Sequence, residues 1–269
     1  MNYWTNSKDN IFVAAHRGWL QLFPENTMEA FRAAAGLGVD QIETDIHMTK
    51  DGELVIIHDH KLDRTTNGTG LVKDYTLAEL KQLDAGSHKG IQFRNARIPT
   101  LRELFDLVKE YPALTLDLEL KDYPSEGQEA FAYESCDKVI AMIEEYGYGD
   151  RLVLNSWNGT LNEYIFKKYG KKYRQHVYYP QHHIKGAYDI DPYSYAFCAC
   201  MFDDQGTGDV VSSKEACSAM AAKGVEPWAG AGVKCGADVE KVIEAGCTLI
   251  TCNNPDVILD ELRARGKHK

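Results

Sequence analysis

Residues 114–120 read Leu-Thr-Leu-Asp-Leu-Glu-Leu, so that every second residue is a leucine. A strand here would place Asp117 and Glu119 together on the opposite face. We expect so apolar a strand to lie inside the protein. Similar short apolar runs alternate with longer segments of helical period, a pattern typical of parallel strands joined by crossover helices. The eight expected strands are 11–15, 41–47, 114–120, 152–156, 175–179, 195–201, 225–229 and 248–252.

The strand number and the chain length predict the same architecture. The chain has 269 residues, and a (β/α)8 barrel takes about 250. We therefore expect a single α/β domain over residues 1–269, folded as a (β/α)8 TIM barrel. Residues 59–97 interrupt the alternation after the second strand with turn-forming sequence. We expect this segment to be an insertion that lies over the mouth of the barrel.

Cap residues indicate where the helices begin and end. Asn26 is expected to cap a helix that stops at Gly36 and Gly38. Apolar spacing predicts further helices over 101–109 and 237–245.

The charge of the chain excludes one class of partner. Lys and Arg number 30 against 40 Asp and Glu, which gives a formal net charge of -10. A general nucleic-acid binder needs an excess of cations, so we expect no nucleic-acid partner. An anionic substrate would need a local cationic pocket.

Cysteine content and apolar patterning bear on the compartment. Seven cysteines without a framework spacing indicate free thiols in a reducing compartment. No apolar run approaches a transmembrane length, and the first residues lack a signal-peptide pattern. We expect a cytoplasmic protein without stable membrane insertion. A secreted form with a removed signal peptide, and a homo-oligomer, both stay open.

Three carboxylates are expected to converge at one end of the barrel. Glu43 and Asp45 are two residues apart on the second strand, so they share a face. At an effective dielectric near 20, two such charges about 4 Å apart repel by about 4 kcal/mol. Either one is protonated or a cation lies between them. Glu119 adds a third carboxylate, whereas Asp117, deeper in the same strand, is a weaker candidate. Such hard oxygen donors suit Mg²⁺ or Ca²⁺.

Cationic and imidazole groups are expected beside these acids. Lys121 lies two residues after Glu119 and points the same way. His16 and Arg17 directly follow the first strand, at the rim where barrel loops build active sites. A tight turn at 50–52 brings His58 back toward the end of the second strand. A lone histidine is more often structural than catalytic, but two of them near three acids favour catalysis.

The other histidines of this region and of the second half have no arrangement that spacing alone supports. We expect them to be structural or exposed to solvent. They are His47, His60, His88, His176, His182 and His183.

The candidate residues belong to a longer series of ordered motifs. The series includes His16-Arg17-Gly18, Pro24-Glu25-Asn26-Thr27, Glu43-x-Asp45, Thr49-x-Asp51-Gly52, His58-Asp59, Arg64-Thr65-Thr66-Asn67-Gly68 and Glu119-x-Lys121. With these motifs the sequence resembles the glycerophosphodiester phosphodiesterase family, within the phospholipase C-like phosphodiesterase superfamily. Several short motifs in the correct order are far more specific than any one of them.

The resemblance implies an enzyme that hydrolyses small glycerophosphodiesters to sn-glycerol 3-phosphate and an alcohol. It also implies acid/base catalysis by two histidines, two phosphate-binding cations, and one divalent cation, Mg²⁺ or Ca²⁺, held by three carboxylates. These residues are, in that order, His16 and His58; Arg17 and Lys121; Glu43, Asp45 and Glu119.

The second half of the chain matches the family less well. Trp228 lies in the seventh strand, where the family has a tryptophan, and is expected at the substrate pocket. Residues 251–255 read Thr-Cys-Asn-Asn-Pro where the family has Thr-Asp-x-Pro. We expect Asn253 and Asn254 to alter the distal pocket, which leaves the head-group preference open.

Other interpretations stay open at this point. A phospholipase D-like enzyme that forms cyclic phosphates from lysolipids or sphingolipids would need an apolar rim. A catalytically silent barrel would lack a histidine or carboxylate of the site. A sugar-phosphate isomerase would need a glycine-rich loop, of which residues 230–232 are a faint version. The sequence does not distinguish attack by a glycerol hydroxyl from attack by water. The candidate rim residues, more simply explained by packing of the first loop, are Trp19, Leu20, Leu22 and Phe23.

Overall fold

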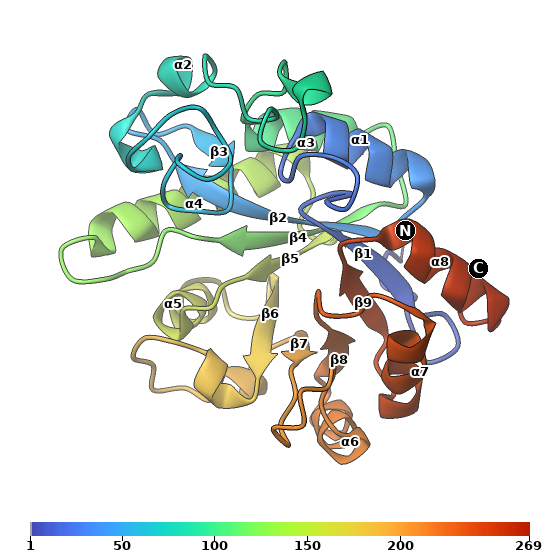
Figure 1. Ribbon diagram of the computed structural model, residues 1–269. Coiled ribbons are helices and arrows are strands. Elements are labelled where there is room, and N and C mark those ends of the chain that lie inside the picture. The colour runs from blue at the N-terminus through green and yellow to red at the C-terminus, as the bar shows by residue number, and fades with distance from the viewer. Residues whose placement is uncertain (1) are drawn as a thin grey trace.

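The computed structural model describes residues 2–269, in which eight parallel strands close into a barrel. Neighbouring strands pair in chain order, and the last strand pairs with the first. Figure 1 shows these strands at the centre. The expected TIM barrel is confirmed. The barrel strands are β1 Phe12–His16, β2 Gln41–Met48, β4 Thr115–Leu120, β5 Leu152–Asn155, β6 Arg174–Tyr179, β7 Cys198–Met201, β8 Glu226–Ala229 and β9 Leu249–Cys252.

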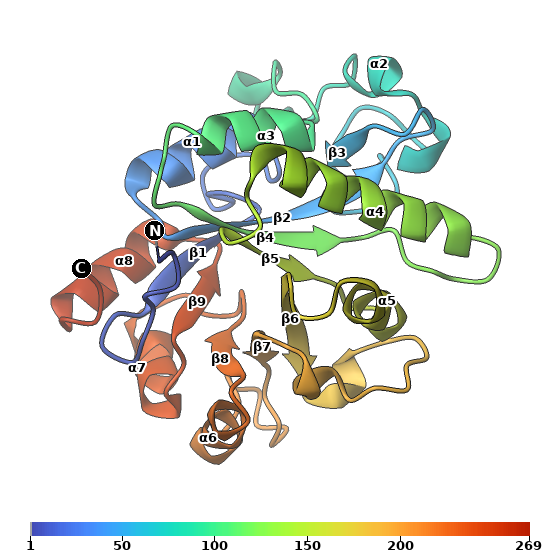
Figure 2. The same ribbon diagram turned by 180° about the vertical axis from the view of Figure 1, so that it is seen from behind.

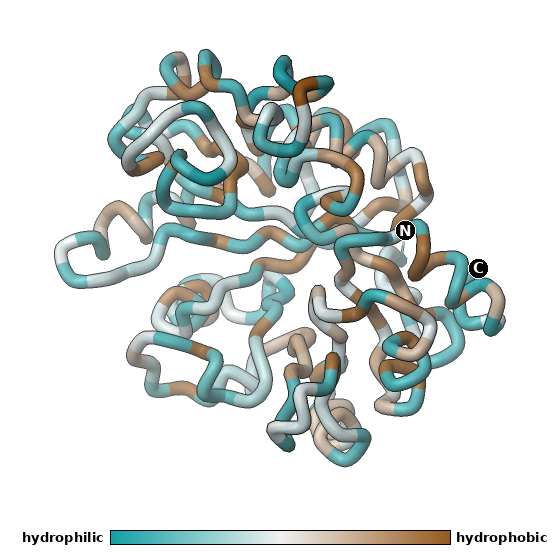
Figure 3. Tube along the Cα trace, viewed as in Figure 1, coloured by the Kyte–Doolittle hydropathy of each residue, from teal (hydrophilic) through white to brown (hydrophobic). Residues whose placement is uncertain are grey.

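Helices surround the strands on the outside, as the views from front and back show (Figures 1 and 2). They turn apolar side chains toward the sheet, so a continuous core fills the space between the two layers. In Figure 3 hydrophobic segments run along the strands. The outer helices are α1 Met28–Leu37, α3 Leu101–Val108, α4 Glu129–Tyr146, α5 Gly159–Tyr169, α6 Lys214–Ala222, α7 Gly236–Ala245 and α8 Pro255–Ala264.

All eight expected strands are present with bounds within one residue of those expected, except one that begins three residues later. The strand expected from residue 195 starts at Cys198. The preceding residues Pro192–Ser194 form a 3-10 turn capped by Asp191, whose side chain accepts from the amide of Tyr193 at 3.0 Å. That turn continues to the amide of Ala196, which donates to Pro192, so these residues are not free to join the sheet.

The cap of α1 also differs from the expectation by one residue. Thr27, not Asn26, caps the helix and accepts from the amide of Ala30 at 3.3 Å. Asn26 has a positive φ of 54° and turns its amide inward instead. Its side chain donates to Asp45 at 2.8 Å, so Asn26 supports the barrel mouth.

The segment after β2 packs beside the barrel mouth. The strand β3 (Leu54–Ile56) runs antiparallel to β2 after a turn at Gly52, and α2 (Leu77–Leu80) follows. The segment has a small apolar core of its own. Figure 1 shows it at one side of the molecule. It therefore packs beside β2, and its expected position over the mouth stays a prediction. This core consists of Val55, Ile57, Leu62, Val72, Leu80, Ala85 and Ile98.

The cysteine side chains carry free thiols, as expected. The seven cysteines are free, and only Cys235 is exposed. Within residues 2–269, the helices lack the combination of length and apolarity that crossing a bilayer requires.

Candidate active site

A cavity of about 250 Å³ opens at the C-terminal ends of the barrel strands. That end is where (β/α)8 enzymes carry their active sites. A larger surface depression of about 660 Å³ is lined by residues from 203–214 and 241–245, none of which is an expected site residue. We therefore take the smaller cavity as the candidate site. Its walls are formed by His16, Arg17, Glu43, His58, Asp117, Glu119, Asn155, Trp157, His176, Tyr178, Cys200, Phe202, Gly230, Ala231, Gly232 and Thr251.

Strand register brings the three expected carboxylates together. Asp45 on β2 is the register partner of Glu119 on β4, and Glu43 lies two residues before Asp45. All three are buried, and one oxygen of each lies within 4.8 Å of the others. Burial, with the nearby charges of Asp45 and Glu119, raises the pKa of Glu43. Burial also raises the pKa of Glu119 to about 7. The three carboxylates therefore disfavour one another's ionised form.

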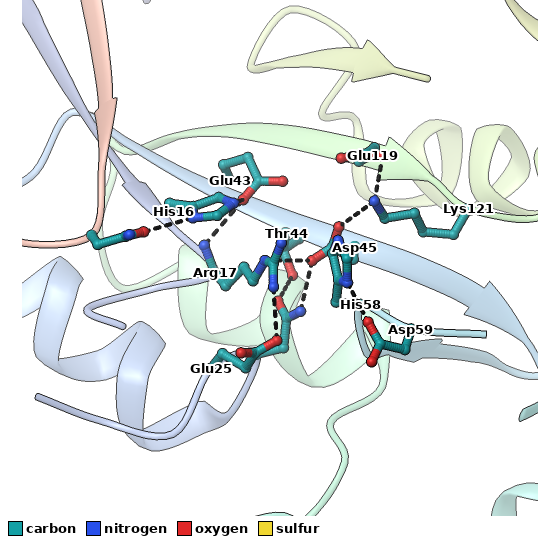
Figure 4. A network of polar contacts seen from close by, with 12 residues as sticks. His16, Arg17, Glu25, Glu43, Thr44, Asp45, His58, Asp59, Glu119 and Lys121 are labelled. Carbon is teal, nitrogen blue, oxygen red and sulfur yellow. Dashed lines mark hydrogen bonds and ion pairs between the residues drawn. The ribbon is translucent and has the colours of Figure 1, made fainter. Parts of the chain in front are cut away.

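A buried lysine and a partly exposed arginine compensate part of this negative charge (Figure 4). The ammonium of Lys121 lies 2.5 Å from Glu119 Oε1 and 3.0 Å from Asp45 Oδ1. The guanidinium of Arg17 approaches Asp45 at 3.4 Å, and its backbone amide donates to Glu43 at 3.0 Å. Burial would raise the pKa of Asp45, but Lys121 and Arg17 outweigh it and lower that pKa to about 2. Asp45 is therefore ionised.

The carboxylate group fits a hard divalent cation. Mg²⁺ and Ca²⁺ prefer oxygen donors, and Glu43, Asp45 and Glu119 supply three that are already close together. Burial, followed by repulsion from neighbouring carboxylates, raises the pKa of Glu43 and of Glu119, and a divalent ion would relieve the repulsion. Lys121 competes for two of the same carboxylates, so an ion there would displace its ammonium from at least one of them.

His16 is held by a residue of the loop that follows β9. Its Nδ1 lies 2.7 Å from Asn253 Oδ1, and its Nε2 lies 3.9 Å from Glu43. Burial and the charge of Arg17 lower the pKa of His16 to about 4. The ring is therefore neutral near pH 7, and Nδ1 carries the proton because the amide oxygen only accepts. We had expected Asn253 to alter the distal pocket, but it instead orients this ring.

His58 is held by a chain of ion pairs that reaches into the insertion. Its Nδ1 lies 2.5 Å from Asp59, and Arg64 binds the same carboxylate through Nε at 2.7 Å. Arg64 also binds Glu25 through two contacts of 2.8 Å, and Glu25 accepts from Arg17 at 2.9 Å. Bidentate contacts of this kind fix geometry as well as charge. Arg64 thereby connects His58 with Arg17.

The opposite wall of the cavity is aromatic. Trp157 follows β5, Tyr178 lies on β6, and Phe202 follows β7. The rings of Trp157 and Tyr178 stack with centroids 3.8 Å apart, and Phe202 lies 5.6 Å from Trp157 at an interplanar angle of 20°. Sequence reasoning missed these residues, although their places at the C-terminal ends of strands could have identified them.

Trp228 does not line the cavity, contrary to the expectation. It is fully buried in the barrel interior, where it packs with Trp4 and Phe197. Its indole donates to Glu226 at 3.3 Å. A large ring on the short strand β8 fills the barrel below the mouth, and the residues that follow, Gly230 to Gly232, line the cavity instead.

Asp117 and His176 form the floor of the cavity. Asp117 and His176 both line the cavity and pair at 2.7 Å, so Asp117 is engaged away from the three carboxylates. His176 is buried, which is the first of the two roles expected for it, structural or exposed to solvent. Among the candidate rim residues, only Leu22 is exposed, at 52%. Trp19 packs instead against Phe23, with centroids 6.0 Å apart.

The barrel and its mouth of acids, cations and histidines define an enzyme of the (β/α)8 class with its site at the C-terminal strand ends. Residues 16–201 match the family described as the glycerophosphoryl diester phosphodiesterase family. The chain belongs to this family, and it is a phosphodiesterase. The resemblance seen in the motifs is thereby confirmed.

Individual relatives agree with this assignment. The glycerophosphodiester phosphodiesterase of Caldanaerobacter subterraneus subsp. tengcongensis is 36% identical over 265 residues, covering 94% of this chain and 98% of the relative. An Oleispira antarctica phosphodiesterase, solved in complex with the product sn-glycerol-3-phosphate, is 25% identical with a TM-score of 0.78 and covers 94% and 96% of the two chains. A Silicibacter pomeroyi structure is 23% identical with a TM-score of 0.81, covers 96% and 95%, and supports the fold alone.

Proposed function

We propose that the chain hydrolyses glycerophosphodiesters to sn-glycerol 3-phosphate and an alcohol, with a divalent cation held by Glu43, Asp45 and Glu119. The observation that carries this proposal is the convergence of these three buried carboxylates within 4.8 Å, beside two histidines. Family membership supports the phosphodiester chemistry, and the product complex of the Oleispira relative supports the glycerol phosphate moiety. Mg²⁺ and Ca²⁺ are the ions that best suit the donor set.

The cationic side chains would receive the phosphate. Arg17 lines the cavity, whereas Lys121 lies just behind it on Glu119. When bound, the divalent cation would supply Lewis acidity at a phosphate oxygen. Arg17, and Lys121 once released from one carboxylate, would stabilise the negative charge that develops around phosphorus.

The two histidines would move the protons. Each has one ring nitrogen occupied by a fixed partner, Asn253 for His16 and Asp59 for His58, which leaves Nε2 for the substrate. One imidazole takes the proton of the attacking hydroxyl or water. The other protonates the leaving alkoxide, which is otherwise a poor leaving group at neutral pH.

A coupled assay for glycerol 3-phosphate tests this proposal. Purified protein is assayed on glycerophosphocholine, glycerophosphoethanolamine and a lysolipid, after chelation and again after Mg²⁺ or Ca²⁺ is restored. We expect release from the glycerophosphodiesters that chelation removes and the ion restores. Hydrolysis that is insensitive to the chelator would refute the metal role. Cyclic phosphate released from the lysolipid alone would favour the phospholipase D-like alternative.

A further inference from the structure

A second group of potential metal ligands lies outside the cavity. His47 lies on β2, His60 lies in the loop after β3, and Asp122 follows the end of β4. One ring nitrogen of each histidine and one oxygen of Asp122 lie within 4.8 Å of one another. The proposed hydrolysis gives none of these residues a task.

The carboxylate of this group is held in one orientation. Asp122 Oδ2 accepts from the amide of Met48 at 2.8 Å and from the hydroxyl of Ser135 at 2.7 Å. Its Oδ1 lies 2.7 Å from His47 Nδ1. Outer contacts of this kind orient the carboxylates that bind metals.

The two imidazoles lie close together, and hydrogen bonds orient the ring of His47. Their ring centroids lie 4.8 Å apart, and His60 is exposed. His47 Nε2 lies 3.4 Å from the backbone oxygen of His58. A metal-binding histidine commonly donates its other N–H to a backbone carbonyl, so Nδ1 of His47 is the nitrogen left for an ion. A surface cavity of about 220 Å³, lined by His60 and Asp122, gives access and room for water.

We propose that His47, His60 and Asp122 form a second metal site, which binds a transition-metal ion such as Zn²⁺. Two imidazoles and one carboxylate suit Zn²⁺, whereas Mg²⁺ and Ca²⁺ prefer oxygen donors alone. A water molecule from the surface cavity would be the fourth ligand of the ion. The ion would replace the direct contact between His47 Nδ1 and Asp122 Oδ1. It cross-links β2, the start of the insertion and the end of β4.

Metal content per chain tests the site directly. The full chain and its variants are dialysed against a small excess of Zn²⁺, and bound zinc is measured by elemental analysis. We expect His60→Ala to bind one Zn²⁺ fewer than the wild type. The exposed ring of His60 can be removed with little effect on folding, and a circular dichroism spectrum checks this. The matched control is His182→Ala, an exposed histidine of the 3-10 turn Gln181–His183, which keeps the wild-type zinc content.

A second measurement separates this site from the carboxylate site. In Glu119→Gln the zinc bound by His47, His60 and Asp122 persists, and it is lost when His60→Ala is added. Equal zinc content in the wild type and His60→Ala would overturn the proposal, as would a loss in His182→Ala of the same size. Mg²⁺-supported hydrolysis by His60→Ala reports on the proposed function separately, so failure of one proposal is distinguishable from failure of the other.

Discussion

The two halves of the barrel mouth differ in chemistry. One half is built by β1, β2, β4 and the insertion. It carries the two catalytic candidates His16 and His58, and ion pairs connect its acidic and cationic side chains. The half built by β5 to β9 carries stacked rings and small or neutral residues such as Thr251. Charge must be held at fixed distances to act on a phosphate, whereas an alcohol needs mainly shape and apolar contact. The first half is therefore assigned to reaction and the second to the choice of head group.

Removal of either histidine should cause the largest loss of activity, so it tests the proposed division of the barrel mouth most strongly. We expect His16→Ala or His58→Ala to lower kcat by about 10²–10⁴-fold, because general acid or base catalysis contributes that much. Thermal unfolding should stay near the wild type. The coupled assay with saturating Mg²⁺ measures the loss, with His182→Ala as control. Substantial turnover in either variant would contradict the assignment.

Loss of one carboxylate should affect the ion rather than the fold. In Glu119→Gln we expect the Mg²⁺ concentration for half-maximal activity to rise by about 100-fold, since a lost carboxylate charge near a divalent ion costs several kcal/mol. Activity at several Mg²⁺ concentrations gives this value. An unchanged Mg²⁺ requirement would place the ion elsewhere.

Arg64 tests whether the insertion takes part in the reaction. We expect Arg64→Ala to lower kcat by about 10–100-fold, because it releases the partners that orient His58 and Arg17. KM should change less. Arg97→Ala, in the same segment but bonded only to backbone oxygens, is the control. A kcat equal to the wild type would confine the insertion to a structural role.

The raised pKa of Glu119 predicts a pH dependence. A proton competes with the ion for this carboxylate, and the pKa of Glu119 is raised to about 7. As the pH rises toward 7, Glu119 loses its proton, and we expect the Mg²⁺ affinity to increase by up to about tenfold per pH unit. Above pH 7 the affinity should level off. Calorimetric titration from pH 5.5 to 8.5 measures this. The dependence should flatten in Glu119→Gln, and an equally steep one there would assign the titration to another group.

The aromatic half should respond differently and less strongly. We expect Trp157→Ala to raise KM by roughly 2–10-fold, the equivalent of about 0.5–1.5 kcal/mol for an aromatic contact, with kcat nearly unchanged. The ratio of activities on glycerophosphocholine and glycerophosphoethanolamine should shift. A kcat loss as large as that of the histidine variants, with KM unchanged, would remove the division between the halves.

Much of the reactive half could be predicted because it depends on strand periodicity. Glu43 and Asp45 share a face by alternation, and β2 to β4 register then places Glu119 beside Asp45. Position after a strand likewise identified His16. Alternation along one strand and position at a strand end follow from local geometry, so the sequence contains them, whereas the β2–β4 register comes from the folded sheet.

The remaining contacts could not be predicted because they join distant segments. Asn253 contacts His16 across 237 positions, and Arg64 contacts Glu25 across 39. Trp228 fits a family pattern, but burial below the mouth depends on how all strands pack. Asn26 was assigned to a helix cap because its role at Asp45 needs the folded β2.

The position of a bound ion is the most direct test of the central claim. A crystal grown with Mn²⁺ and sn-glycerol 3-phosphate gives an anomalous difference map that locates the ion independently of activity. We predict a peak about 2.0–2.3 Å from one oxygen each of Glu43, Asp45 and Glu119, with Lys121 displaced from at least one carboxylate. A map with no peak there, and Lys121 still bridging Asp45 and Glu119 beside bound product, would contradict the account.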